Sequence, residues 1–252
     1  MKVFAILLAT VFAVAGAGDK PAASPVLVEL FTSEGCSSCP PADAWLEKMD
    51  TQPLPGDELV VLSEHVDYWN HDGWKDPYSS AMFTDRQGAY VRALGLSEPY
   101  TPQIIVDGTA ELRGNDPHVN QIFQKAADDA KVPLHIGPIS VEGTTAPILR
   151  AHIEADGSSE EHNGDVYVAV ALSHVESKVL HGENSGRQLS HVAVVESLKK
   201  IGKLEKGRRF SQDFQTKLKP GTDPKNIRLI AFVQEPGPGK VLGAALERVP
   251  AH

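Results

Sequence analysis

The sequence predicts an α/β domain followed by a small all-β, sandwich-like domain. Up to about residue 131, short β-type apolar runs alternate with helical patterns, an order typical of a sheet covered by helices. After residue 138, predicted strands are separated by turn-forming segments with hardly any helical stretch between them, which favours an antiparallel sandwich. We therefore predict an α/β domain at 24–133 and a sandwich-like domain at 134–252.

A strand, a helix and a second strand open the predicted α/β domain. Val26–Phe31 is apolar and β-branched and ends at a polar turn, which is typical of a strand. Ala42–Met49 has apolar residues at helical spacing. Glu58–His65 contains a nearly continuous apolar run, as in a strand buried on both faces. This order suggests a right-handed parallel β-α-β unit.

The remaining elements are predicted by the same patterns. The turn Asp107-Gly108 has the composition of a two-residue hairpin. Asn115 or Asp116 is predicted to cap the helix that follows it. These elements are a helix at 82–94, strands at 103–106 and 109–113, a helix from 117 to about 131, and strands at 148–153, 166–174, 191–198, 227–234 and 241–248.

The first 17 residues have the pattern of an export signal. Lys2 is followed by the apolar run Val3–Val14 and by the small residues Ala15-Gly16-Ala17. The apolar run rises only about 18 Å as a helix, too short for a bilayer core of about 30 Å. We expect no membrane anchor and a periplasmic or secreted protein.

Composition narrows the classes of partner. The net charge of −9 and the pI near 5.6 argue against binding to nucleic acid or to anionic membranes. Two cysteines exclude a disulfide-dense scaffold. The sequence has no Walker loop, dinucleotide fingerprint or serine-nucleophile elbow, so we expect no cofactor.

Cys36 and Cys39 form a C-x-x-C motif between the first predicted strand and the first predicted helix. This is the redox arrangement of a thioredoxin-like fold, in which two nearby thiols close a small ring. Cys36 fits the attacking role and Cys39 the resolving role. Pro40 and Pro41 cannot lie deep in a helix, so the helix should begin near them and contribute little to the acidity of Cys36.

Two further positions are similar to those of thioredoxin-like folds. Thr101-Pro102 precedes the third predicted strand, where such folds hold an X-Pro bond in cis beside the disulfide. Glu29 lies on the buried first strand, where such folds often keep a carboxylate behind the second cysteine. A buried carboxylate of raised pKa could accept the proton of the resolving thiol of Cys39.

Longer segments carry a resemblance to a known family. The sequence resembles the exported thioredoxin-like family of unknown function with the hallmark F-T-S-x-G-C-S-S-C-P-P-A-D, which Phe31–Asp43 matches. The segments His65–Trp69, Gly73–Pro77, Tyr100–Gly108 and Gly182–Arg187 are also similar to recurring segments of that family. The resemblance implies a thioredoxin-like fold and a redox-active pair, but it supplies no substrate.

These observations predict thiol–disulfide exchange with an unknown protein or with a small-molecule thiol or disulfide. One alternative is a non-catalytic binding module with a structural disulfide. Another is Cu(I) handling by Cys36, Cys39 and His65, since Cu(I) prefers soft ligands. His65 or Asp67 could line the cleft of Cys36, or His65 could be a hydrogen-bonded structural residue. His191 fits a surface or core position, and Gly182–Arg187 fits a loop that touches the first domain.

Overall fold

The computed structural model describes residues 24–52, 58–113, 116–143, 145–159 and 163–249. The predicted export signal at 1–17 and Asn115 lie outside these residues. The elements are β1 (Pro25–Thr32), α1 (Pro40–Thr51), β2 (Glu58–His65), η1 (Tyr68–His71), α2 (Ala81–Ala93), β3 (Gln103–Val106), β4 (Ala110–Leu112), α3 (Val119–Asp128), β5 (Leu134–Ile136), β6 (Ser140–Glu142), β7 (Ile148–Asp156), β8 (Gly164–Lys178), β9 (Gln188–Leu204), β10 (Arg209–Lys217), η2 (Pro224–Asn226), β11 (Ile227–Gln234) and β12 (Val241–Arg248).

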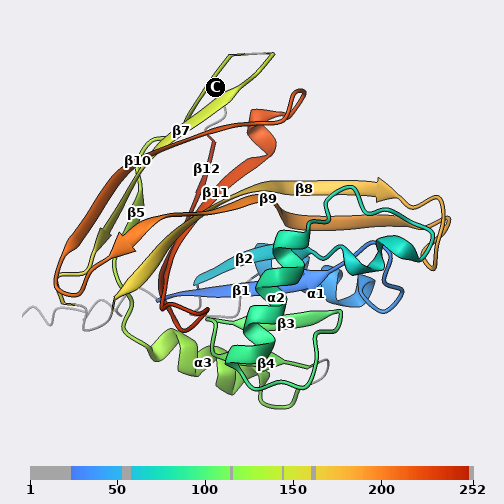
Figure 1. The fold of residues 1–252 in the computed structure, drawn as a ribbon, viewed down its shortest axis with the longest axis horizontal. Coiled ribbons are helices and arrows are strands. Elements are labelled where there is room, and N and C mark those ends of the chain that lie inside the picture. The colour runs from blue at the N-terminus through green and yellow to red at the C-terminus, as the bar shows by residue number, and fades with distance from the viewer. Residues whose placement is uncertain (1–23, 53–57, 114–115, 144, 160–162, 250–252) are drawn as a thin grey trace, which may run out of the picture.

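The chain is a mixed α/β protein built on one large sheet with few helices. The large sheet has eight strands in the order β12-β11-β8-β9-β2-β1-β3-β4 (Figure 1). β1 pairs in parallel with β2, and β3 pairs antiparallel to β1. β1 and β2 are almost wholly buried because α1 and α3 cover one face of the sheet there, and α2 and β12 pack on the other. One hydrophobic core lies under α1 and α3, and another under α2.

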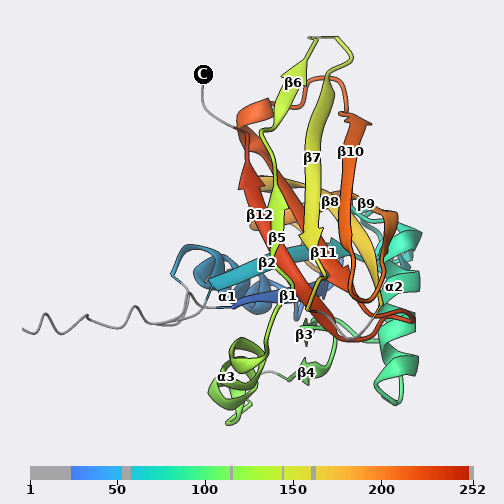
Figure 2. The same cartoon turned by 90° about the vertical axis from the view of Figure 1, so that its left-hand side faces the viewer.

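The strands that follow residue 133 belong to two sheets. β9 pairs in parallel with β2 at Ser63↔Val194, so that β9, β8, β11 and β12 extend the sheet of the N-terminal half. β5, β6, β7 and β10 form a second sheet. Figure 2 shows β7 and β10 beside the strands β11 and β12 of the large sheet. The all-β character of this half is as predicted, whereas the sequence did not predict that its strands join those of the first half.

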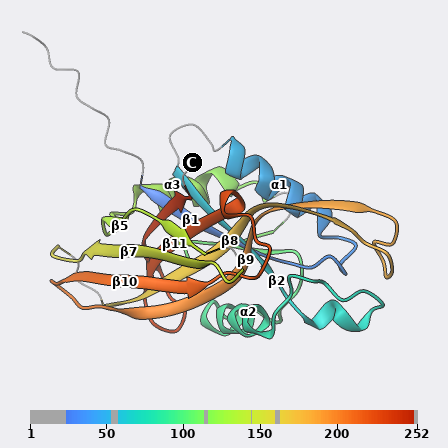
Figure 3. The same cartoon turned by 90° about the horizontal axis from the view of Figure 1, so that it is seen from above.

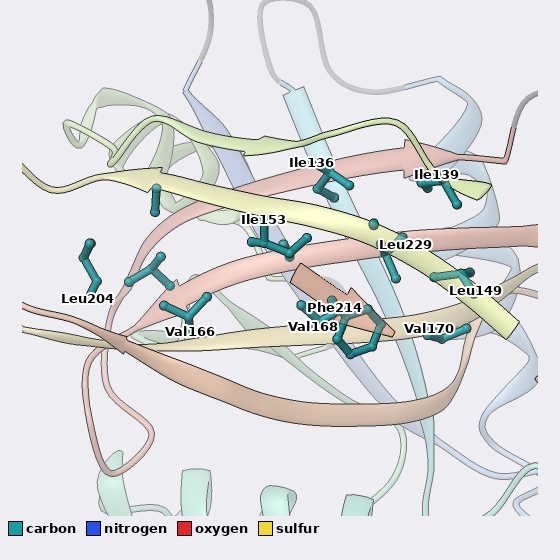
Figure 4. Close-up of a cluster of buried hydrophobic side chains, with 14 of the residues drawn as sticks. Ile136, Ile139, Leu149, Ile153, Val166, Val168, Val170, Leu204, Phe214 and Leu229 are labelled. Carbon is teal, nitrogen blue, oxygen red and sulfur yellow. The ribbon is translucent and has the colours of Figure 1, made fainter. Parts of the chain in front are cut away.

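A separate hydrophobic core lies between the two sheets (Figure 4). Leu149 and Ile153 of β7 and Phe214 of β10 pack there with side chains of β8 and β11, such as Val168 and Leu229. This packing of one sheet face on another is typical of a sandwich.

Asp107 and Gly108 form a turn as predicted, and both have positive φ angles, 49° and 69°, as in a type I′ turn. The connection between β3 and β4 has three residues, 107–109, and not the predicted two, because Val106 pairs with Ala110. Gly108 also has a packing reason to lack a side chain, because a Cβ there would collide with the main-chain oxygen of Gly239. The hairpin therefore packs closely against the β11–β12 turn.

Candidate functional site

Cys36 and Cys39 form a disulfide at the end of β1, immediately before α1. Cys39 is the N-cap residue of α1, and Pro40 and Pro41 occupy the first helical positions, where the missing N–H groups cost no hydrogen bond. The predicted helix start is thus confirmed. Both cysteines have no exposed surface, whereas Ser37 and Ser38 between them are exposed.

The Thr101-Pro102 peptide bond is cis, and the segment lies beside the disulfide loop. The Ser38 hydroxyl donates a 3.4 Å hydrogen bond to the main-chain oxygen of Thr101. The indole N–H of Trp69 donates a 2.7 Å bond to the Thr101 hydroxyl. Because Ser38 belongs to the disulfide loop, this contact brings four of the predicted site residues into one region: Cys36, Cys39, Thr101 and Pro102.

A cleft of about 460 Å³ borders this region. Ser38 and Pro102 line it next to the disulfide loop, and Asp116 supplies its one acidic lining residue. The other lining residues are mostly apolar and come from α1, β3, β4 and α3: Pro41, Ala42, Trp45, Ile104, Leu112 and Val119. Apolar clefts with a few polar groups are the usual form of a ligand site.

Glu29 lies on the other face of the sheet. Neighbouring strand residues face opposite sides, and Val28 and Leu30 belong to the core under α1. Glu29 instead accepts a 2.6 Å hydrogen bond from Nε of Arg86 and a short one from the Tyr90 hydroxyl, both on α2. Its hydrogen bonds and ion pairs within the described residues thus come from α2, and not from the disulfide loop.

The segment 179–187, which we call the hairpin tip, joins β8 to β9 and covers Cys36. Figures 1 and 3 show this connection reaching the loops that follow β1 and β2. The Asn184 side chain donates 2.9 Å hydrogen bonds to the main-chain oxygens of Glu34 and Cys36. The Glu183 carboxylate accepts a 3.2 Å bond from the main-chain N–H of Ser37. The predicted contact between Gly182–Arg187 and the N-terminal half is confirmed.

Five buried titratable side chains lie together behind the disulfide loop: Glu34, Asp43, His65, Asp76 and His191, which we call the histidine–carboxyl cluster. His65 Nδ1 is 2.7 Å from Oδ2 of Asp76, which also accepts a 2.8 Å bond from the main-chain N–H of Glu34. The rings of His65 and His191 meet edge to face at 4.8 Å.

The charge state of the His65–Asp76 pair follows from its surroundings. Burial lowers the pKa of His65, but the charge and hydrogen bond of Asp76, together with the charges of Asp43 and Glu34, outweigh burial, so the pKa is raised overall. Burial raises the pKa of Asp76, yet His65 and two main-chain N–H groups lower it below its usual range. The two side chains therefore form a buried ion pair.

Other cluster atoms have no hydrogen-bond partner among the residues that the structure describes. These are Oε1 of Glu34, Oδ1 of Asp43, Nε2 of His65 and both ring nitrogens of His191. The second oxygen of Glu34 is bound by the indole N–H of Trp74 at 2.7 Å. Buried polar atoms without partners are uncommon in proteins, so such a group of them calls for an explanation.

Four members of the cluster lie in segments that resemble the family, but nothing in the sequence predicts that these side chains meet. The fifth, His191, is a single histidine among valines. Asp67, considered as a cleft residue, accepts a 2.6 Å bond from Thr84 of α2 instead. Within the described ranges, no group of three or more His, Cys, Asp and Glu side chains is arranged to hold a metal ion. None of the helices in that part of the chain has the length and apolar character needed to span a bilayer.

Comparisons with known proteins identify a family and two similar structures. No curated protein matches the chain. The crystal structure of protein AGR_C_4864 from Agrobacterium tumefaciens is 28% identical, with a TM-score of 0.67, over 90% of this chain and 95% of that one. HBP35 of Porphyromonas gingivalis is 18% identical, with a TM-score of 0.66, over 90% of this chain and 76% of that one, and shows likeness of fold alone. The family described as "Protein of unknown function (DUF1223)" matches residues 27–234, and the chain belongs to this family.

Proposed function

We propose that this protein is an exported thioredoxin-like thiol–disulfide oxidoreductase that uses the Cys36–Cys39 pair. The observation that carries the proposal is the position of the disulfide loop beside cis-Pro102, at the border of an apolar cleft. The order β1-α1-β2-α2-β3-β4-α3, with β1 parallel to β2 and antiparallel to β3, also supports it. The apolar run and small residues at the N-terminus support export.

The reaction takes two steps. In the reduced protein, the Cys36 thiolate attacks one sulfur of a substrate disulfide, the substrate S–S bond breaks, and its second sulfur leaves as a thiolate that takes a proton from solvent. The Cys39 thiolate then attacks Sγ of Cys36 and releases the first substrate sulfur. The substrate gains two electrons and the cysteine pair loses them. Run backwards, the same steps oxidise a substrate dithiol.

The cleft supports a polypeptide substrate. A cysteine bound at Cys36 would have neighbours along its chain that reach Trp45 and Ile104, whose side chains line the cleft. The main chain of Thr101 borders the same region, and its oxygen accepts a hydrogen bond from the Ser38 hydroxyl. This main chain could align a substrate strand. Access to Cys36 requires the hairpin tip to move, because Cys36 has no exposed surface in the disulfide form.

The test is exchange with a peptide disulfide, followed by the reduction potential. Cys36→Ser should abolish turnover, and Cys39→Ser should accumulate a mixed disulfide through Cys36. Turnover that survives Cys36→Ser would refute the assignment. A potential of roughly −120 to −270 mV is the range of known exchange proteins. A potential below about −300 mV would instead mark a structural disulfide and favour the binding-module alternative.

A further inference from the structure

Opening or closing the disulfide moves protons as well as electrons. Each sulfur that leaves as a thiolate is protonated at neutral pH unless its pKa is low, and Cys39 must lose its proton before it attacks. Cys39 has no exposed surface in this structure. A group inside the protein is therefore the nearest candidate to exchange a proton with it.

Asp43 has the required position relative to Cys39. Cys39 has helical backbone angles, φ −77° and ψ −37°, and Asp43 follows it by four residues. The main-chain N–H of Asp43 donates a 3.1 Å hydrogen bond to the Cys39 oxygen. Side chains at i and i+4 lie on the same face of a helix, about 5–6 Å apart at Cβ. The Asp43 side chain thus leaves α1 one turn after Cys39 on the same face of the helix, and Asp43 is only 5% exposed.

His191 joins Asp43 to a second carboxyl on the other side of the disulfide loop. Its Nδ1 is 3.5 Å from Oδ1 of Asp43, and its Nε2 is 3.9 Å from Oε1 of Glu34. Glu34 precedes Cys36 by two residues, whereas Asp43 follows Cys39, so the imidazole spans the space beneath the loop. None of these four atoms has a hydrogen-bond partner. Buried polar atoms without partners destabilise a folded protein, so their presence here calls for a functional explanation.

The other charged neighbours of His191 are already engaged. His65 of β2 meets its ring edge to face and is held by Asp76, as described above. Tyr78 packs edge to face on the far side of His65, with ring centroids 5.6 Å apart. Glu29, the carboxylate that the sequence suggested, is bound to Arg86 on the opposite face of the sheet. Besides Nε2 of His65, the cluster atoms without a partner among the described residues therefore belong to Asp43, His191 and Glu34.

We infer that Asp43 is the acid–base partner of Cys39, and that His191, held between Asp43 and Glu34, positions Asp43 and shares its proton. The inference rests on the proposed function. As Cys39 attacks the mixed disulfide, its S–H proton passes to Asp43, the new Cys36–Cys39 bond forms, and the substrate sulfur leaves. In the reverse direction, the electron pair of the broken bond stays on Cys39, which takes the proton back.

Asp43→Asn separates a proton-transfer role from a structural one. Removing a negative charge beside the thiol should lower the pKa of Cys39, which can be read from thiolate absorbance in a Cys36→Ser background. The same substitution should nevertheless slow the attack of Cys39 on a mixed disulfide by about a hundredfold near pH 7, the size typical of acid–base catalysis. The gap should close at alkaline pH, where solvent removes the proton. A more acidic thiol that reacts more slowly is the signature expected.

The full-length protein serves for these experiments. His191→Gln is a second variant, in which the attack of Cys39 on the mixed disulfide should be slowed less than in Asp43→Asn but with the same pH dependence. Asp85→Asn on the exposed side of α2 and His174→Gln on β8 are matched controls, and denaturant unfolding checks that each variant is folded. Slowing by the same factor at every pH, or no slowing in either variant, would overturn the inference while exchange by the wild-type protein stands. Absence of exchange in the wild-type protein would refute the proposed function itself.

Discussion

The side-chain amide of Asn184 donates a 2.9 Å hydrogen bond to the main-chain oxygen of Cys36, across 148 residues of chain. The same amide binds the oxygen of Glu34, so one buried side chain of the C-terminal half fixes the disulfide loop at two points. The reactivity of the disulfide should therefore depend on Asn184, although this side chain takes no direct part in thiol chemistry.

Asn184→Ala should make the disulfide easier to reduce. The variant leaves two main-chain oxygens without their donor, at a cost of about 1–3 kcal/mol, and loosens the hairpin tip over Cys36. We expect reduction by a water-soluble phosphine to accelerate about tenfold, corresponding to about 1.4 kcal/mol, measured by mass spectrometry after alkylation. Ser185→Ala is the control, since the Ser185 hydroxyl bonds only within the tip, to Leu180. Equal rates for Asn184→Ala and wild type would contradict the prediction.

Two glycines of the hairpin tip offer a matched pair of substitutions. Gly182 and Gly186 both have positive φ angles, 76° and 82°, so alanine costs about 1–2 kcal/mol of backbone strain at either position. A Cβ on Gly182 would also lie 3.0 Å from the Asp72 oxygen and 3.2 Å from Cβ of Trp74, whereas nothing lies within 4 Å at Gly186.

Gly182→Ala should therefore lower the free energy of unfolding more than Gly186→Ala does. We expect the difference to be about 1 kcal/mol or more, because the new methyl group crowds main-chain atoms that cannot yield easily. Urea unfolding of both variants measures it. Only Gly182→Ala should also speed reduction of the disulfide. Identical losses in the two variants would show that the tip does not pack on Asp72 and Trp74 in solution.

The His65–Asp76 ion pair should give stability a bell-shaped pH dependence. Removing one partner of a buried pair costs about 3–5 kcal/mol, so Asp76→Asn should destabilise strongly. The raised pKa of His65 contributes stability that is full below about pH 6.5 and is lost as pH rises through the folded-state value. The lowered pKa of Asp76 contributes stability that is full above about pH 3.9 and is lost as pH falls through its folded-state value.

The measurement is urea unfolding of the wild-type protein and of Asp76→Asn over a series of pH values. Their difference should be largest between about pH 4 and 6.5, the interval in which both partners contribute their full stability. A difference that stays constant from acid to alkaline pH would mean that the two side chains contribute packing rather than charge.

Glu64 should destabilise the protein as pH rises. Burial raises its pKa well above the ordinary value, and the nearby charge of Glu29 raises it further, although Arg86 opposes both. The folded state therefore holds a proton that the unfolded chain loses above about pH 4.3. Stability linked to this group is full below that pH and is lost as pH rises toward the folded-state value.

Glu64→Gln should remove this alkaline loss. The amide keeps the shape of the side chain but cannot ionise, so the variant should equal or exceed the wild-type free energy of unfolding near pH 8. The advantage should shrink toward pH 4, as urea titrations at both pH values would show. A variant that is less stable than wild type at both values would indicate that Glu64 stays charged and pairs with Arg86, which lies 3.5 Å away.

The sequence predicted best the strands that are buried on both faces. The predicted bounds of β2, β3 and β11 agree with the structure, because continuous apolar runs end sharply at polar or turn residues. The bounds of β12 also agree, although its last four residues are half-buried or exposed. β10 was missed, since Phe214 is its one buried residue and its other side chains are polar or partly exposed. β9, predicted at 191–198, extends to Leu204 through a basic segment whose side chains are mostly exposed or half-buried.

Only part of the candidate site could be predicted, because local motifs are visible in the sequence and long-range contacts are not. Cys36, Cys39 and Pro102 belong to local motifs, and such motifs can be recognised from sequence alone. The alternation along β1 separates Glu29 from Val28, but which helix covers which face depends on how the whole chain folds. His191 reaches the disulfide region only because β9 lies beside β2, and that pairing joins positions 131 residues apart, Ser63 and Val194. No local pattern contains this information.

The pairing of β9 with β2 bears on how the chain could be divided. A fragment that ended at residue 133 would lose β9 and leave β2 as an unprotected edge strand, with free main-chain donors and acceptors beside Val61 and Leu62. Exposed apolar edges of this kind pair with other chains and aggregate. The first half, although its composition resembles an independent domain, should thus depend on the second half for solubility as well as for the covering of its disulfide.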